Sequence, residues 1–161
     1  MKNLTTKDLL KLISPNSDVR RELTNRGVIR SGNIVGDIGE YYCEEFFNKT
    51  PSLPNLVRSP PGVRNVDMMS RRGERYSVKT VTSRRGTTGS FWNPDSIRKN
   101  EKNFEYLVIV ILDKLYDLEL LLRLSWDDFF EYKRYNSRMD NFNISLTNRL
   151  INSVEILYEK N

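Results

Sequence analysis

Residues 106 to 112 form an uninterrupted apolar run, YLVIVIL, which constrains the fold more than any other feature of the sequence. The run is dense in β-branched residues, as is typical of a central strand buried on both faces of a sheet. The segment LELLLRLS at residues 118 to 125 can pair beside it. We therefore expect a sheet whose two faces are covered by the rest of the chain.

Two shorter segments, VRNVDMMS and ERYSVKTVT, meet at a turn-like stretch with a central glycine, which predicts a β-hairpin over about residues 64 to 82. Helical spacing occurs at residues 4 to 13 and 17 to 27, and again in a longer segment that Asn33 caps. The segment SWDDFFEYKR begins a further helix at a serine cap. This order predicts an α/β fold with a mixed β-sheet of about four or five strands flanked by helices.

The length of 161 residues fits a single domain, because domains usually contain roughly 100 to 200 residues. We divide it into N-terminal helices at 1–30, a core at 33–125 and a C-terminal helical segment at 126–161. The longest apolar stretch is too short to span a membrane and the N-terminus lacks the apolar run of a signal peptide, so we expect a cytoplasmic protein without a membrane partner.

The composition excludes several kinds of chemistry. The chain has no histidine and one cysteine, Cys43, so it offers neither a zinc site nor an imidazole base nor an intramolecular disulfide. A magnesium site needs only oxygen ligands and remains open to it. The net charge of +5 favours a polyanionic partner.

Asp67 and Lys79 are the first candidates for chemistry, because they lie on the two predicted strands of the hairpin. An acid among apolar neighbours is costly to bury unless it is paired or binds a metal. Asp67 and the backbone carbonyl of Val78 could hold Mg²⁺, with Mn²⁺ as a substitute, and Lys79 could orient or deprotonate an attacking water. The simpler alternative is a cross-strand ion pair on an exposed face.

Glu40 is the candidate for a second carboxylate ligand. It lies at the edge of the apolar stripe of the long predicted helix. The neighbouring Gly39 removes a side chain from the inner face, so the helix can pack closely on the sheet and bring Glu40 toward the strand ends. The alternative is a solvated glutamate, since Asp37, Glu44 and Glu45 predict an acidic outer face on the same helix.

These three segments, GDIGEYYCEEFF, NVDMMS and YSVKT, followed by a further buried strand, resemble the PD-(D/E)XK nuclease superfamily, which has the restriction-endonuclease-like fold. The resemblance covers about residues 33 to 112 and implies that Glu40, Asp67 and Lys79 bind the metal and support attack by water. It departs at Ser77, where the family usually has Glu, Asp or Gln. By analogy with members that move the acid to a helix, Glu40 or Glu44 would supply it, with Glu74 a weaker substitute.

Basic and aromatic residues near these segments are candidates for DNA contacts. The hairpin turn holds Arg71 and Arg72, and the polar loop after Lys79 holds Arg84, Arg85 and Trp92. Guanidinium groups suit phosphates and guanine edges, and Trp92 can pack against sugar or base. Solvated arginines and a packing role for Trp92 are the alternatives.

The sequence thus predicts a magnesium-dependent DNA endonuclease without a nucleotide cofactor, most simply a type II restriction-type enzyme. A homodimer would supply the two sites needed to cut both strands. A Holliday-junction resolvase or repair-type nuclease is the alternative within the same chemistry. A catalytically degenerate DNA-binding protein of the same fold, or a plain structural domain, is the alternative outside it.

Overall fold

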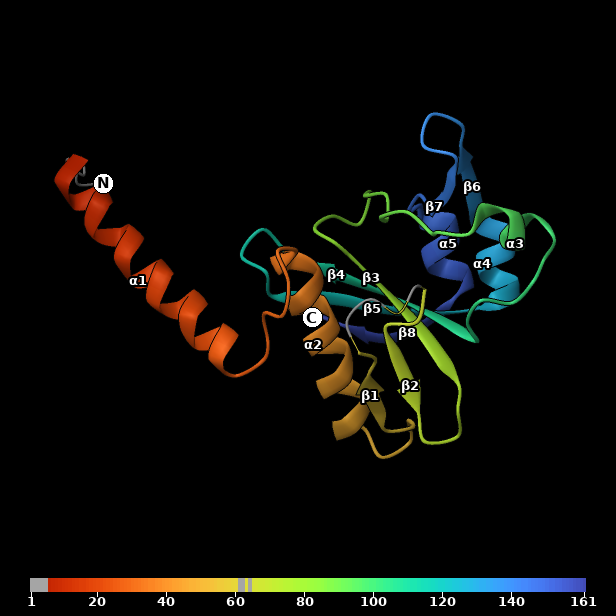
Figure 1. Ribbon diagram of the computed structural model, residues 1–161, viewed down its shortest axis with the longest axis horizontal. Coiled ribbons are helices and arrows are strands. Elements are labelled where there is room, and N and C mark those ends of the chain that lie inside the picture. Colours follow the sequence, from red (N-terminus) through yellow and green to blue (C-terminus); the bar gives the residue numbers. More distant parts are fainter. Residues whose placement is uncertain (1–5, 61–62, 64) are drawn as a thin grey trace.

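The computed structural model describes residues 6–60, 63 and 65–161 (Figure 1). Its centre is a six-stranded sheet with the order β1-β2-β3-β4-β5-β8. The strands are β1 (Leu56–Arg58), β2 (Met68–Ser70), β3 (Arg75–Val81), β4 (Tyr106–Leu112), β5 (Leu118–Ser125) and β8 (Glu155–Glu159). Only β3 and β4 pair in parallel, and every other neighbouring pair is antiparallel. The fold is therefore mixed α/β, with six strands rather than the four or five expected.

Helix α2 (Ile34–Lys49) covers one face of the sheet. Asn33 caps it as predicted, accepting a hydrogen bond from the Gly36 amide at 3.2 Å. Cys43 and Phe47 of this helix are fully buried against β2, β3 and β4.

The opposite face is covered by shorter elements: α3 (Pro94–Arg98), α4 (Trp126–Tyr132), α5 (Asn148–Ser153) and the ribbon of β6 (Lys133–Asn136) and β7 (Asn141–Ile144). The serine cap predicted for α4 is present, as Ser125 and Asp128 form a reciprocal capping box. The run at residues 106 to 112 is confirmed as the central strand β4, because both faces of the sheet are covered there.

The prediction of a C-terminal helical segment at 126–161 was wrong. Beyond α4 the chain forms β6 and β7, the short α5, and β8 as the sheet's edge strand. The side chains of β8 are all exposed or half-buried, so its sequence lacks the contrast between apolar and polar positions that marks a half-buried strand.

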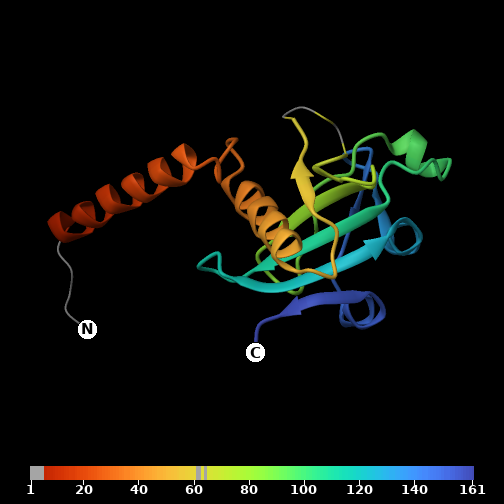
Figure 2. The same ribbon diagram turned by 90° about the horizontal axis from the view of Figure 1, so that it is seen from below.

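The two predicted N-terminal helices form one helix, α1 (Thr6–Asn25), which continues through Pro15 and projects away from the sheet (Figures 1 and 2). Proline removes one helical hydrogen bond and crowds the preceding turn, so it is disfavoured inside a helix. Residues around it are exposed, so solvent can satisfy the freed carbonyl group. None of the helices in the described ranges combines the length and the apolar character needed to cross a membrane.

Candidate active site

Asp67 lies directly before β2, where its backbone continues the hairpin ladder through a bond from its amide to the Tyr76 carbonyl at 2.8 Å. Its carboxylate oxygen Oδ2 accepts hydrogen bonds from the Val78 amide at 2.6 Å and the Ser77 hydroxyl at 3.2 Å. The Asp67 side chain thus accepts the hydrogen bond that a backbone carbonyl would otherwise accept from the Val78 amide. Both bonds fall on Oδ2.

The hairpin brings Lys79 and Asp67 to one cavity, which both residues line. The Asp67 side chain reaches Ser77 and Val78 of β3, and Ser77 and Lys79 share one face of that strand by the alternation of its side chains. The Lys79 ammonium nitrogen lies 5.1 Å from the centroid of the buried Phe91 ring. Within the described residues it forms no ion pair, which argues against the simple cross-strand pair with Asp67.

Gly39 sets how close α2 comes to the sheet. A Cβ atom at this position would lie 1.9 Å from Thr80 Oγ1, so no other residue fits without moving the helix. The predicted role of Gly39 in close packing is confirmed. The next residue, Glu40, lines two adjoining cavities of about 200 and 230 Å³ together with Asp67, and Lys79 lines the second of these.

The pKa of Glu40 is raised from 4.5 to about 7, chiefly by burial and then by the negative charges of Asp67 and Asp37, against the opposing effect of Arg58 and Arg30. The positive charges nearby do not fully offset the two carboxylates Glu40 and Asp67, so binding of a cation between them is favourable.

The donors at this point suit a hard divalent cation. Glu40 and Asp67 offer carboxylate oxygens, and the Val78 carbonyl points to the same strand edge as the Val78 amide that binds Asp67. Mg²⁺ is usually held by one or two carboxylates with waters completing its shell, so this set fits it. No group of three or more His, Cys, Asp or Glu side chains with metal-binding geometry occurs in the described part of the chain.

The other acids considered as ligands have different partners. Glu44 forms an ion pair with the Arg58 guanidinium at 2.7 Å, in which both side chains are largely buried. Glu74 binds the Ser70 hydroxyl at the hairpin turn. Of the acids proposed to replace the one missing at Ser77, the structure therefore brings only Glu40 next to Asp67.

Asp37 was predicted on an acidic outer face, and this was wrong. It is buried, and its carboxylate accepts hydrogen bonds from the Arg30 and Ser31 amides at 2.9 and 2.7 Å and from the Ser31 hydroxyl. It therefore fastens the segment before α2 to the helix. The contact joins residues six and seven positions apart across a loop, and no periodic pattern in the sequence signals it.

The candidate DNA-binding residues do not gather in one place. Arg84 binds Glu119 of β5 at 2.5 Å and Glu159 of β8 at 2.8 Å, so it ties the loop after β3 to the sheet. Arg85 is exposed. Arg71 and Arg72 lie at the hairpin turn, the end opposite Asp67, and line a different pocket. The interpretation that all four arginines flank one site was wrong, because β2 separates the turn from Asp67.

Trp92 lies near the candidate site. Trp92 is 56% exposed. The Asn65 side-chain amide holds its backbone through two hydrogen bonds, accepting one from the Trp92 amide and donating one to the Trp92 carbonyl. Asn65 is two residues before Asp67, so Trp92 is held beside the segment that carries the carboxylate. Its exposure argues against a packing role.

A scan against protein-family models and a search of curated proteins found no match for this chain.

Proposed function

We propose that this chain is a metal-dependent endonuclease that hydrolyses phosphodiester bonds in DNA, with the restriction-endonuclease-like fold of the PD-(D/E)XK superfamily. The observation that carries the proposal is the cavity shared by Glu40, Asp67 and Lys79, in which neighbouring negative charge and burial raise the pKa of Glu40 to about 7. A divalent cation would relieve that charge, and a nearby ammonium group completes a set able to support hydrolysis.

Each residue has a separate role in this proposal. Asp67, Glu40 and the Val78 carbonyl would hold Mg²⁺ or Mn²⁺, while the Val78 amide and Ser77 fix the Asp67 carboxylate through Oδ2. The bound cation supplies Lewis-acid polarisation of the phosphoryl oxygen. Lys79 orients the attacking water or stabilises charge on the phosphoryl oxygens, and the exposed Arg85 and Trp92 contact the DNA backbone or bases.

A type II restriction-type enzyme acting as a homodimer is the preferred role, because one chain offers one such site and a duplex has two strands. Junction resolution or repair would use the same chemistry on a branched or damaged substrate. Products from linear, branched and mismatched DNA of the same sequence would separate these roles.

The first test is to incubate the protein with supercoiled plasmid in Mg²⁺ or Mn²⁺, with EDTA as a control, and to resolve the products on a gel. Asp67→Asn is the informative variant, because the amide oxygen can still accept the Val78 hydrogen bond while the charge is lost. Glu101→Gln, at an exposed acid, is the matched control. Cleavage should require the metal, disappear in Asp67→Asn and persist in Glu101→Gln. Cleavage that survives Asp67→Asn would remove this site from the proposal.

A catalytically degenerate DNA-binding protein is the second candidate, and Ser77 favours it. The fully buried Ser77 hydroxyl donates to Asp67 where the family usually has an acid. Ser77→Glu separates the two functions. If the parent chain is degenerate, it does not cleave DNA, and Ser77→Glu should add a metal-dependent increase in thermal stability. If the parent is active through Glu40, Ser77→Glu should abolish or alter its cleavage.

A further inference from the structure

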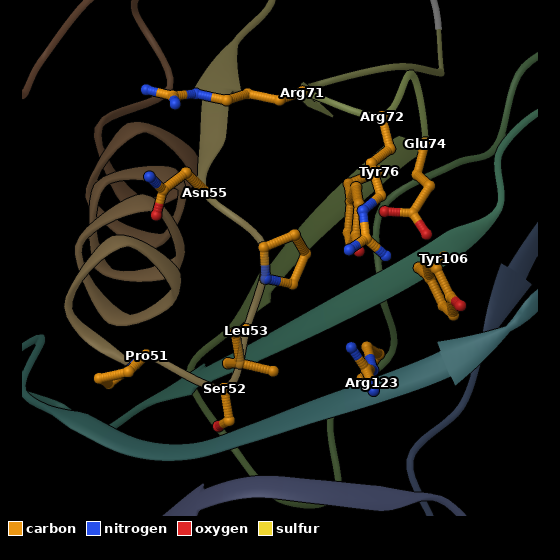
Figure 3. A pocket seen from close by; sticks show the side chains of 11 residues that line it. Pro51, Ser52, Leu53, Asn55, Arg71, Arg72, Glu74, Tyr76, Tyr106 and Arg123 are labelled. Carbon is orange, nitrogen blue, oxygen red and sulfur yellow. The ribbon is translucent and has the colours of Figure 1, made fainter.

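A second pocket, of about 490 Å³, lies at the turn end of the β2–β3 hairpin (Figure 3). One wall is the loop of residues 51–55 that follows α2, and the other is the hairpin turn with Arg71, Arg72 and Glu74. Its volume falls within the roughly 300 to 1,000 Å³ that is usual for small-molecule sites.

The floor of this pocket is a ladder of side chains across three strands. The rings of Tyr76 and Tyr106 stack with their centroids 5.1 Å apart, and the Arg123 guanidinium lies 5.1 Å from the centroid of the Tyr106 ring. The Nε atom of Arg123 binds Glu155 at 2.7 Å. Arg123 is therefore held in one orientation, and its side chain lines the pocket.

The turn adds two guanidinium groups that are not neutralised. Arg71 and Arg72 are exposed, and their guanidinium groups form no ion pair or hydrogen bond with the described residues. Figure 3 shows Arg72 and Arg123 reaching into the pocket from opposite sides, while Arg71 extends on the side of Asn55. An anion between Arg72 and Arg123 would be bound by both, and guanidinium forks match the geometry of a phosphate.

The pocket also has a part that does not suit a bare anion. The Glu74 carboxylate is fixed by the Ser70 hydroxyl at 2.9 Å, and the half-buried Tyr106 and Leu53 offer aromatic and aliphatic surface. A carboxylate accepts hydrogen bonds from an amino group, and the Leu53 side chain with the outer edge of the Tyr106 ring offers apolar surface to a base. The two parts together match a phosphate joined to a base.

We propose that this pocket binds a phosphorylated nucleoside, with the phosphate between Arg72 and Arg123 and an amino-bearing base near Tyr106 and Glu74. The ligand is either a free mononucleotide or the phosphorylated end of a DNA strand. The pocket shares no lining residue with the two cavities that Glu40, Asp67 and Lys79 line, so this inference goes beyond the proposed nuclease and does not depend on it.

The test is calorimetric titration of the full chain in EDTA. The probes are dAMP, dCMP and dGMP, with deoxyadenosine and inorganic phosphate as the two halves of the ligand, and a short 5′-phosphorylated single strand beside its unphosphorylated form. Arg72→Ala is the chosen variant because the exposed side chain is not needed for folding. Arg138→Ala, at an exposed arginine of the β6–β7 turn, is the matched control.

At least one mononucleotide or the phosphorylated strand should bind ten-fold or more tightly than inorganic phosphate, deoxyadenosine or the unphosphorylated strand. Arg72→Ala should weaken that binding at least ten-fold, and Arg138→Ala should leave it unchanged. Binding confined to the phosphorylated strand identifies a strand end as the ligand. No binding by either class, equal binding of inorganic phosphate, or insensitivity to Arg72→Ala would each overturn the proposal. Asp67→Asn should bind the nucleotide or phosphorylated strand as tightly as the parent chain. Loss of cleavage and loss of nucleotide binding are therefore measured independently.

Discussion

The Glu40 carboxyl group is held where its charged form is unfavourable, and this should be measurable without any substrate. Its pKa is about 7 in the folded chain, against 4.5 as the ordinary value. Folding therefore opposes ionisation, so the protein loses stability as the pH rises from 4.5 to about 7, and the loss is complete above that range.

Glu40→Gln should remove this loss. We expect the variant to be more stable than the parent at pH 8 by about 1–2 kcal/mol, a figure reduced for solvent screening, and equally stable near pH 4. Urea unfolding at both pH values in EDTA measures the difference, with Glu101→Gln as a control that should show none. Under the proposed function, millimolar Mg²⁺ should shrink the advantage of Glu40→Gln. An advantage that is the same at both pH values would contradict the charge argument.

The two neighbouring arginines Arg84 and Arg85 should behave differently when each is replaced by alanine. Arg84→Ala breaks the contacts to Glu119 and Glu159 and should lower the free energy of unfolding by about 1 kcal/mol or less, because these pairs are partly exposed. Arg85→Ala should leave stability unchanged and, if Arg85 contacts a phosphate, reduce the slope of log affinity for DNA against log salt by about 1. A loss of stability in Arg85→Ala, or a change of salt slope in Arg84→Ala alone, would contradict these separate roles.

The sequence predicted the carboxylates and the lysine better than the cations around them. Asp67 and Lys79 line one cavity because β2 and β3 form a hairpin with a short turn, which is readable from the sequence. Arg71 and Arg72 belong to that same turn, and a turn lies at the opposite end of the hairpin from the residue that starts it. Arg84 is held by acids far along the chain in β5 and β8, and local sequence contains no sign of such contacts.

At the scale of elements, the seating of α2 on β3 depends on Gly39. Gly39→Ala would place a methyl group against the Thr80 side chain and force the helix away from the strand. Overpacking of this kind costs about 1–3 kcal/mol, offset in part by about 1 kcal/mol of improved helix propensity. We expect a net loss of stability by urea unfolding, together with a Glu40 pKa that moves back toward 4.5 as the cavity opens.

Gly32→Ala is the matched control, since a Cβ atom there meets nothing within 4 Å. It should leave both stability and the titration of Glu40 unchanged. If Gly39→Ala is as stable as the parent and the pKa of Glu40 is unchanged, then α2 can shift without consequence. In that case the close approach at Gly39 does not position Glu40.

Elements with a strong internal pattern were predictable, and those defined by distant partners were not. β4 carries its burial in its own sequence as a continuous apolar run, and α2 carries helical spacing, although the residues it buries include Cys43 and Phe47 rather than the half-buried Ile38 and Phe46. β8 is a strand only because the edge of β5 accepts it through pairs such as Leu121 with Tyr158. The single helix α1 was predicted as two for a different reason, because its helical spacing falls into two stretches, at residues 4 to 13 and 17 to 27.

At the scale of the whole molecule, the proposed restriction-type role calls for two copies of the chain, since a single Glu40–Asp67–Lys79 site cuts one strand at a time. A homodimer would cut both strands of a site within one bound complex. Mixing copies tests this directly. Adding a several-fold excess of Asp67→Asn to the active chain places most active copies in mixed dimers, which bind DNA but cut one strand.

The plasmid product should then change from linear to nicked circle, rather than merely form more slowly. Chains that act independently would give the same ratio of nicked to linear product at every mixing ratio, once compared at equal extents of cleavage. Sedimentation of the two chains, alone and mixed, checks that they associate under the assay conditions. A monomer in sedimentation combined with an unchanged product ratio would remove the homodimer and favour a nuclease that nicks one strand, as expected for a repair-type role.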